Sequence, residues 1–361
     1  MRKKGYIIFI IIFVLIVIAI ISSIIWYKGA IKAVDEDGKD KVEVIEIKSG
    51  TSTTGIISLL KDNNIIKSEL ASKIYIKLHN VRNIQAGKYE FNQSMSLQDV
   101  LEQLSSGKVV DETVKITFQE GKNMRYIAST IAEKTSNSKD DVYEVLESNI
   151  YITSLIDKYW FLTKDIQNKN IYYPLEGYLY PDTYEFENKD IDVKSIFEKM
   201  LDQTDKVLTK YKKDIQNSEY SVHEILTMAS IVELEGNNSE NRQKIASVIY
   251  NRLNKNMSLG SDVTTYYAIK VDMGERDLYS KEINTFNSYN TRGPNMEGKL
   301  PVGPIANVSE ESINAVLNPD NNDYLFFVAD KNGEIYFSKT NAEHEETIAN
   351  LRKKGLWYEY E

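Results

Sequence analysis

Residues 221–236 carry the sequence SVHEILTMASIVELEG, which decides how the second half of the chain folds. Ser221 and Glu224 match a capping box, in which each side chain bonds the backbone N–H of the other residue. Gly236 follows the last turn and is a natural end for a helix. The segment therefore predicts a capped helix that begins after Ser221 and ends at Glu235.

Two acidic residues lie within the apolar face of this predicted helix. At about 100° per residue, Glu233 falls between Ala229 and Leu226, and Glu235 falls on the other flank of the same face. A carboxylate among apolar neighbours is poorly hydrated when charged, so the protonated acid is favoured, as a general acid requires. The alternative is that both acids are solvated at a frayed helix end. Because they point about 160° apart, they are not the close pair that a retaining glycoside hydrolase uses.

The N-terminus carries a long apolar segment. Residues 5–27 contain no charged side chain and are mostly Ile, Val, Leu and Phe. As a helix they would span roughly 35 Å, enough for a hydrocarbon core of about 30 Å. Arg2, Lys3 and Lys4 precede the segment, which favours a cytoplasmic tail of residues 1–4 and export of the rest of the chain. We expect a single-pass anchor in the cell membrane. The alternative, a cleaved signal peptide, fits less well because no small-x-small site follows the apolar run.

A polar tether, residues 28–41, leads into a repeated strand-turn-helix pattern. Its three copies have strands at 44–47, 89–91 and 115–118, each followed by a turn and an apolar helical face. No copy is large enough to bury a core alone, so we expect them to pack together as one α/β subdomain over residues 42–135. The pattern resembles LysM-type modules, which bind peptidoglycan or chitin-like sugars. Plain packing without sugar binding is the alternative.

Composition excludes several classes of function. The chain has 361 residues, 44 basic and 53 acidic side chains, no cysteine and three scattered histidines. An acidic chain without a basic run argues against nucleic acid as a partner. The absence of cysteine excludes a thiolate zinc site and a catalytic thiol, and the histidine spacing does not match a metal site. We therefore expect no metal and no cofactor.

A family resemblance is carried by short strings in the second half of the chain. They are LEGYLYPDTY (175–184), ASIVELE (229–235), IASVIYNRL (245–253), LGSD (259–262), SYNT (288–291), LPVGPI (300–305), YLFFVA (324–329) and FSKT (337–340). In this order they resemble the MltG/YceG-like endolytic murein transglycosylases. Any one string is weak, but their order behind an N-terminal anchor is specific. The resemblance implies a YceG-like catalytic domain over residues 136–361.

The resemblance also implies residue roles. Glu233, the first glutamate of the ASIVELE string, matches the acid/base residue of the family. Polar residues inside the strings are candidate substrate contacts, with turn formation or helix capping as the alternative for each; they are Asn251, Ser261, Asp262, Asn290 and Thr291. Tyr178 is a further candidate because its ring can stack on a sugar, with core packing as the alternative.

The sequence departs from the family pattern at four positions. Leu234 replaces a commonly basic residue, and Val263 and Val302 stand where proline is usual. Ile335 stands where the family often has a histidine, which puts any role for that histidine in doubt.

A single carboxyl is sufficient for the implied chemistry. Glu233 would donate a proton to the oxygen between N-acetylmuramic acid and N-acetylglucosamine. It would then take up the proton of the muramic 6-hydroxyl as that oxygen attacks C1, leaving a 1,6-anhydro end and terminating strand elongation. Because the 6-hydroxyl belongs to the same sugar whose C1 it attacks, the two reacting atoms are already held close together. Glycan strands are the expected substrate, and membrane peptidoglycan synthases are candidate partners. The alternatives are a muramidase-type hydrolase of the same bond and a non-enzymatic anchored scaffold that binds the wall.

The expected fold class is a mixed α+β or α/β arrangement. It consists of an N-terminal transmembrane helix, a LysM-like strand-turn-helix subdomain and a C-terminal YceG-like catalytic domain.

Overall fold

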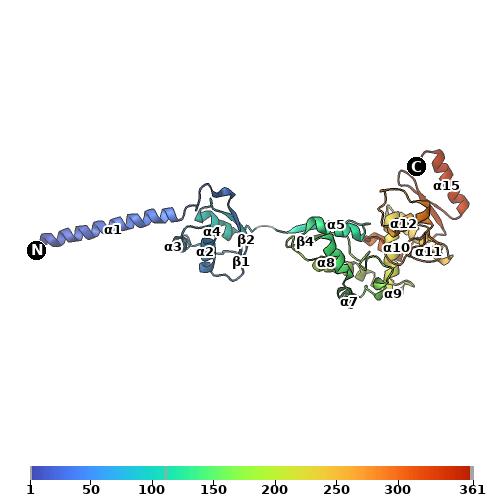
Figure 1. Ribbon diagram of the computed structural model, residues 1–361, viewed down its shortest axis with the longest axis horizontal. Coiled ribbons are helices and arrows are strands. Elements are labelled where there is room, and N and C mark those ends of the chain that lie inside the picture. Colours follow the sequence, from blue (N-terminus) through green and yellow to red (C-terminus); the bar gives the residue numbers. More distant parts are fainter. Residues whose placement is uncertain (1, 110–111, 358–361) are drawn as a thin grey trace. The chain divides into compact units, whose positions relative to one another are not determined.

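The computed structural model describes residues 2–109 and 112–357. Over these residues the fold is mixed α+β, mostly helical, with three antiparallel sheets of two strands each. The chain divides into two compact units, Met1–Glu112 and Thr113–Glu361. Figure 1 shows the elements of each unit in sequence colours.

The first helix, α1 (Arg2–Ala30), contains the predicted anchor. Within its segment Tyr6–Ala30, an 18-residue window has a mean hydropathy of 3.5 and contains no buried residue, while Tyr27 near the end packs against the core of the first unit. By length and composition it can cross a membrane, and it is the one helix in the described part of the chain that can. This is consistent with a signal anchor or with a signal sequence.

The remainder of the first unit is a small α/β module. Strand β1 pairs antiparallel with β2, with Ile45 opposite Tyr89, and the helices cover one face of this pair. Tyr89, Phe91, Leu60 and Leu104 are fully buried in the core. The elements are η1 (Gly38–Asp40), β1 (Val42–Ile47), α2 (Thr53–Asp62), α3 (Glu69–Leu78), β2 (Gly87–Asn92) and α4 (Leu97–Ser106).

The third copy of the predicted repeat belongs to the second unit. Strand β3 (Val114–Thr117) pairs antiparallel with β4 (Thr183–Phe186), and the following helix α5 (Met124–Lys134) packs into the core of residues 114–335. The predicted subdomain boundary at residue 135 therefore differs from the observed division after Glu112. The cause is a strand pairing across more than sixty residues, which the local repeat pattern does not encode.

Helix α10 (Val222–Glu235) lies at the centre of the second unit, in contact with α11 (Ser239–Asn254), α12 (Asp262–Ala268) and α14 (Glu310–Leu317). The capping box is present, with Glu224 N–H donating to the Ser221 hydroxyl at 3.2 Å and Ser221 N–H donating to the Glu224 carboxylate at 2.8 Å. The predicted helix is thus confirmed at both ends. Every residue from Ile225 to Val232 is buried, so α10 is enclosed on all sides.

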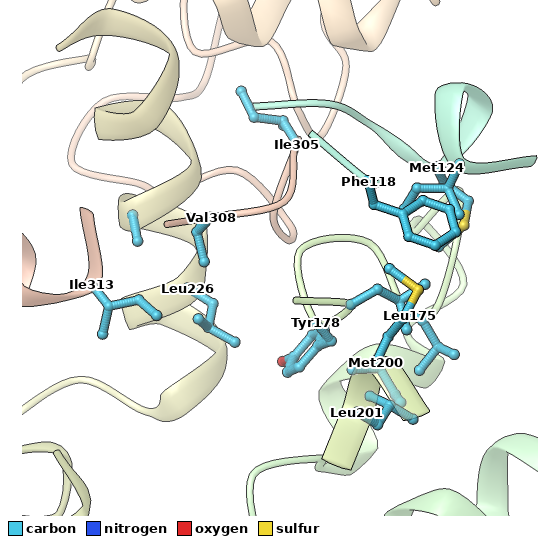
Figure 2. Close-up of a cluster of buried hydrophobic side chains, with 14 of the residues drawn as sticks. Phe118, Met124, Leu175, Tyr178, Met200, Leu201, Leu226, Ile305, Val308 and Ile313 are labelled. Atoms are coloured by element: carbon cyan, nitrogen blue, oxygen red, sulfur yellow. The ribbon is translucent and has the colours of Figure 1, made fainter. Parts of the chain in front are cut away.

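The apolar core joins segments that are far apart in sequence. In Figure 2, Leu226 of α10 faces Val308 and Ile313, while Phe118 and Met124 lie beside Leu175. The remaining elements of this unit are α6 (Lys139–Glu147), α7 (Asn149–Lys158), η2 (Lys164–Gln167), α8 (Val193–Lys210), α9 (Lys212–Asn217), α13 (Ser280–Ile283), β5 (Phe326–Ala329), β6 (Ile335–Ser338) and α15 (Asn341–Lys353). This core fixes the start of α14 against α10.

Candidate active site

Glu233 occupies the last turn of α10, where three helices meet. Its Oε2 accepts three hydrogen bonds, from Ser309 N–H at 2.9 Å, Ser309 Oγ at 2.5 Å and Ser312 Oγ at 2.7 Å. Its Oε1 accepts from Arg242 Nη2 at 3.0 Å. The side chain is 5% exposed. Four donors therefore hold the carboxylate of Glu233 in one orientation.

The donors come from the first turns of two helices. Ser309 is the N-cap of α14, where unpaired backbone N–H groups and the helix dipole favour a negative charge. Arg242 lies on α11 and also donates to Glu311 at 2.6 Å through Nη1. Between α10 and α11, a Cβ on Gly236 would come within 2.5 Å of Arg242 Cγ. Glycine at this position allows Arg242 to reach Glu233.

The surroundings of Glu233 differ from the sequence prediction. An apolar neighbourhood was expected, whereas the carboxylate contacts two serines and an arginine. The prediction considered only residues on the same helix, and these donors come from α11 and α14. The sequence analysis missed Arg242, Ser309 and Ser312. Ser309 before two glutamates is an N-cap signal, but that signal predicts a helix start and not a contact with Glu233.

A second carboxyl, Glu120, lies near Glu233. Glu120 is exposed on the turn that follows β3, and a Cβ on its neighbour Gly121 would lie 3.8 Å from Glu233 Cγ. The turn is held by Gly121 N–H donating to Asn307 O at 3.0 Å. Partial loss of hydration, followed by the negative charge of Glu233, raises the pKa of Glu120. The site thus contains a carboxyl that sequence reasoning did not predict.

Glu235 points to a different part of the unit. It accepts a hydrogen bond from Ser261 Oγ at 2.6 Å, before the start of α12. The residue is partly exposed, but its carboxyl is surrounded by protein, and this burial raises the pKa of Glu235 to about 7. As the helical geometry predicted, Glu233 and Glu235 contact different elements.

Several predicted sugar contacts are buried and already bonded within the protein. Ser261, Asn290 and Thr291 are at most 7% exposed. The Thr291 hydroxyl accepts from Ser261 N–H at 3.0 Å, and the Asn290 amide donates to three backbone carbonyls between residues 282 and 285. These side chains organise the loops around α12 and offer no free surface to a sugar. That they bind substrate stays a prediction.

The other candidates lie outside the surroundings of Glu233. Tyr178 is 1% exposed and its hydroxyl bonds His223 Nδ1 at 2.7 Å, so its ring packs in the core and cannot stack on a sugar. Asp262 is half-exposed and pairs with Arg292 at 2.6 Å. The Asn251 amide donates to the backbone carbonyls of Asn322 and Tyr324. None of the three contacts Glu233 or its donors in the described part of the chain.

The chain was compared with known proteins. Residues 45–350 match the sequence profile of the YceG-like family. The chain belongs to this family. The match begins within the first unit, so family membership covers both units and not only residues 136–361.

Curated relatives and a solved structure agree with this membership. The endolytic murein transglycosylase of Bacillus subtilis (strain 168) is 40% identical over 320 residues, which cover 88% of this chain and 86% of the relative. The endolytic murein transglycosylase of Streptococcus pneumoniae serotype 2 is 29% identical over 88% of this chain, which spans 59% of that relative's length. A crystal structure of a YceG-like protein from Listeria monocytogenes gives a TM-score of 0.61 at 36% identity, covering 85% of this chain and 99% of that chain.

The raised pKa of Glu235 predicts a pH-dependent gain in stability on Glu235→Gln. Between the ordinary glutamate value of 4.5 and about 7, the folded chain holds a proton that the unfolded chain has lost. Stability therefore falls as pH rises through this window, and the neutral amide removes that loss. We expect little change at pH 4 and a gain of up to about 3 kcal/mol at pH 8.

The measurement is thermal unfolding of the full chain in detergent at both pH values. Glu240→Gln is the control, because Glu240 is 76% exposed. An equal effect of Glu235→Gln at pH 4 and pH 8 would contradict the assignment.

Proposed function

We propose that this chain cuts peptidoglycan glycan strands as an endolytic murein transglycosylase, a lyase. It breaks the bond between N-acetylmuramic acid and N-acetylglucosamine within nascent strands, leaves 1,6-anhydro ends and so terminates strand elongation. Family membership and the 40% identical relative support this activity. The observation that carries the proposal is the Glu233 carboxyl, held by four donors at the junction of α10, α11 and α14.

Glu233 is the proposed acid and base. Protonated, it gives its proton to the leaving glycosidic oxygen; as the carboxylate, it takes the proton of the muramic 6-hydroxyl while that oxygen bonds to C1. One group performs both transfers, so the protein must hold it in the same place throughout. The start of α14 and Arg242 supply this rigidity, which supports the assignment. The reaction needs no metal and no organic cofactor.

Muramidase-type hydrolysis of the same bond is the second candidate, and Glu120 is the observation that favours it. A hydrolase needs a second carboxyl to activate water or to attack the sugar. Glu120 lies beside Glu233 and carries a raised pKa, partly through the charge of Glu233. Product analysis separates the two reactions, because hydrolysis leaves reducing ends and transglycosylation leaves 1,6-anhydro ends.

Glu233→Gln is expected to abolish cleavage while the fold survives. The amide is nearly isosteric with the acid but cannot deliver or take up a proton. Loss of general acid-base help costs roughly 10²–10⁴-fold, and we expect the upper end because one residue does both transfers. The measurement is release of 1,6-anhydro fragments from uncrosslinked glycan strands, with circular dichroism as the folding check.

Glu235→Gln is the matched control, two residues along the same helix, and should keep most of the activity. Normal cleavage by a folded Glu233→Gln protein would show that another residue is the acid. Absence of cleavage by the unaltered chain would instead favour the scaffold alternative. Products with only reducing ends would replace the transglycosylase by the hydrolase and leave the substrate unchanged.

Arg242 is a positioning residue in this proposal. Arg242→Gln removes the donor on Glu233 Oε1, and the shorter side chain cannot replace it. A carboxylate misplaced by about 1 Å loses roughly 10²-fold in rate, so we expect kcat to fall to that extent with little change in KM. Steady-state kinetics on glycan strands provide the measurement.

Two further variants test whether the effect of Arg242 comes from its contact with Glu233. Glu311→Gln breaks the other contact of Arg242, to a carboxylate that is 62% exposed, and should stay near full activity. Arg242→Lys should recover part of the lost kcat. An equal loss of kcat in Arg242→Gln and Glu311→Gln would contradict the positioning role.

The proposed location is the cell membrane, with a cytoplasmic N-terminus and the part of the chain after the apolar helix outside the cytoplasm. The uncharged helix and its preceding basic residues support this topology. In sequence, the two strand-turn-helix copies of the first unit lie between the apolar helix and the second unit. Membrane peptidoglycan synthases are candidate partners there.

Protease added to intact, wall-stripped cells should degrade the part of the chain after the apolar helix. The cells carry a C-terminal tag on the protein, and an antibody to the tag follows its loss. A cytoplasmic protein of the same cells must survive as the control for intact membranes. Full protection of the tag would overturn the proposed topology.

A further inference from the structure

An open polar cavity of about 530 Å³ lies in the second unit and is not lined by Glu233 or its donors. Its walls are the turn between α9 and α10, one face of α11, and the segment that follows α14. The volume falls in the range of about 300–1,000 Å³ that small-molecule and cofactor sites occupy. The cavity is therefore large enough to hold sugar rings.

The cavity is separate from Glu233 but fixed to it by two helices. Along α11, Arg242 contacts Glu233 and Asn251 lines the cavity, which is roughly 14 Å further at about 1.5 Å per residue. Along α14, Ser309 contacts Glu233 and Leu317 lines the cavity, roughly 12 Å further. At about 100° per residue, Asn251 lies on the opposite face of α11 from Arg242, so a strand bound at both places would pass around α11.

The lining has the chemistry of a site for uncharged sugars. Six asparagines contribute to it, and amides can both donate to and accept from hydroxyl and N-acetyl groups. Tyr220 and Tyr250 also line it, with ring centroids 5.4 Å apart. Three acidic residues and no Lys or Arg stand among the lining residues, all of which lie in the described part of the chain. This charge disfavours phosphate and other anions.

One wall of the cavity is held in place and another part is free to bond a ligand. Asn251 Nδ2 donates to Asn322 O and Tyr324 O at 3.0 Å each, and Ser247 Oγ donates to Asn322 Oδ1 at 3.1 Å. Within the described residues, the exposed side chains of Asn254 and Asn321 make no hydrogen bond. The held wall is pre-organised for binding, whereas the two free amides become ordered when they bond a ligand.

We propose that this cavity is a second glycan site that holds an uncharged N-acetylglucosamine residue of the strand cut at Glu233. The identity of the glycan rests on the proposed function, whereas the existence of a sugar site rests on the cavity itself. The second site would anchor a strand before and during cleavage. It would therefore act on binding and not on the proton transfers.

A single fluorophore can test binding at the cavity. The chain has no cysteine, so Glu219→Cys at the rim of the cavity accepts one environment-sensitive label. The probe is chitohexaose, added to the labelled full chain in detergent with Glu233→Gln to stop any turnover. We expect a saturable fluorescence change. A label on Glu346→Cys, exposed on α15 of the second unit and away from the cavity lining, should not respond.

The double variant Asn254→Ala/Asn321→Ala provides the decisive comparison. It should raise the Kd reported by the Glu219 label at least fivefold and leave circular dichroism unchanged. No response of the Glu219 label, or an unchanged Kd in the double variant, would overturn the second site even if the enzyme cleaves strands normally. Binding at the label in a protein that never cleaves glycan would support the site and contradict the proposed function instead.

Discussion

The buried carboxylate of Glu233 sets the constraint on which the second unit depends. A charge removed from water must be bonded to donors, or its burial costs several kcal/mol. The chain meets this need with the N-terminus of α14 and the guanidinium of Arg242. Arg242 can approach because residue 236 is a glycine, where a Cβ would come within 2.5 Å of Arg242 Cγ.

Helix α10 positions both Glu233 and the segment that leads to its donor Ser309. A row of polar side chains on it, His223, Thr227 and Ser230, is buried. His223 Nε2 lies 2.9 Å from Val302 O; because a carbonyl only accepts, Nε2 carries the proton and Nδ1 accepts from the Tyr178 hydroxyl. Ser230 Oγ accepts from Ile305 N–H at 3.1 Å. The helix that carries Glu233 therefore also fixes the segment that leads to Ser309.

Local features of the sequence predicted local structure. The capping box at Ser221, the end at Gly236 and the divergence of Glu233 from Glu235 all follow from the geometry of one helix, and the structure shows each of them. The partners of Glu233 could not be predicted in this way, because Ser309 lies 76 residues away. The same limit explains the misplaced subdomain boundary, since β3 pairs with a strand beyond α5, α6 and α7. The roles of polar residues in the family strings were ambiguous, because hydroxyl and amide side chains form hydrogen bonds within loops as readily as with ligands.

Two glutamates on one turn of helix α10 have carboxyls in different surroundings. Burial raises the pKa of Glu235 to about 7, as suits a general acid, yet its carboxyl is surrounded by protein and bonded to Ser261. Glu233 lies instead beside the turn of Gly121, next to the exposed Glu120. A general acid must first reach the atom that it protonates, and its pKa matters only then. The hydrogen bonds from Ser309, Ser312 and Arg242 hold the Glu233 carboxyl in one position, as the proposed giving and taking back of a proton requires.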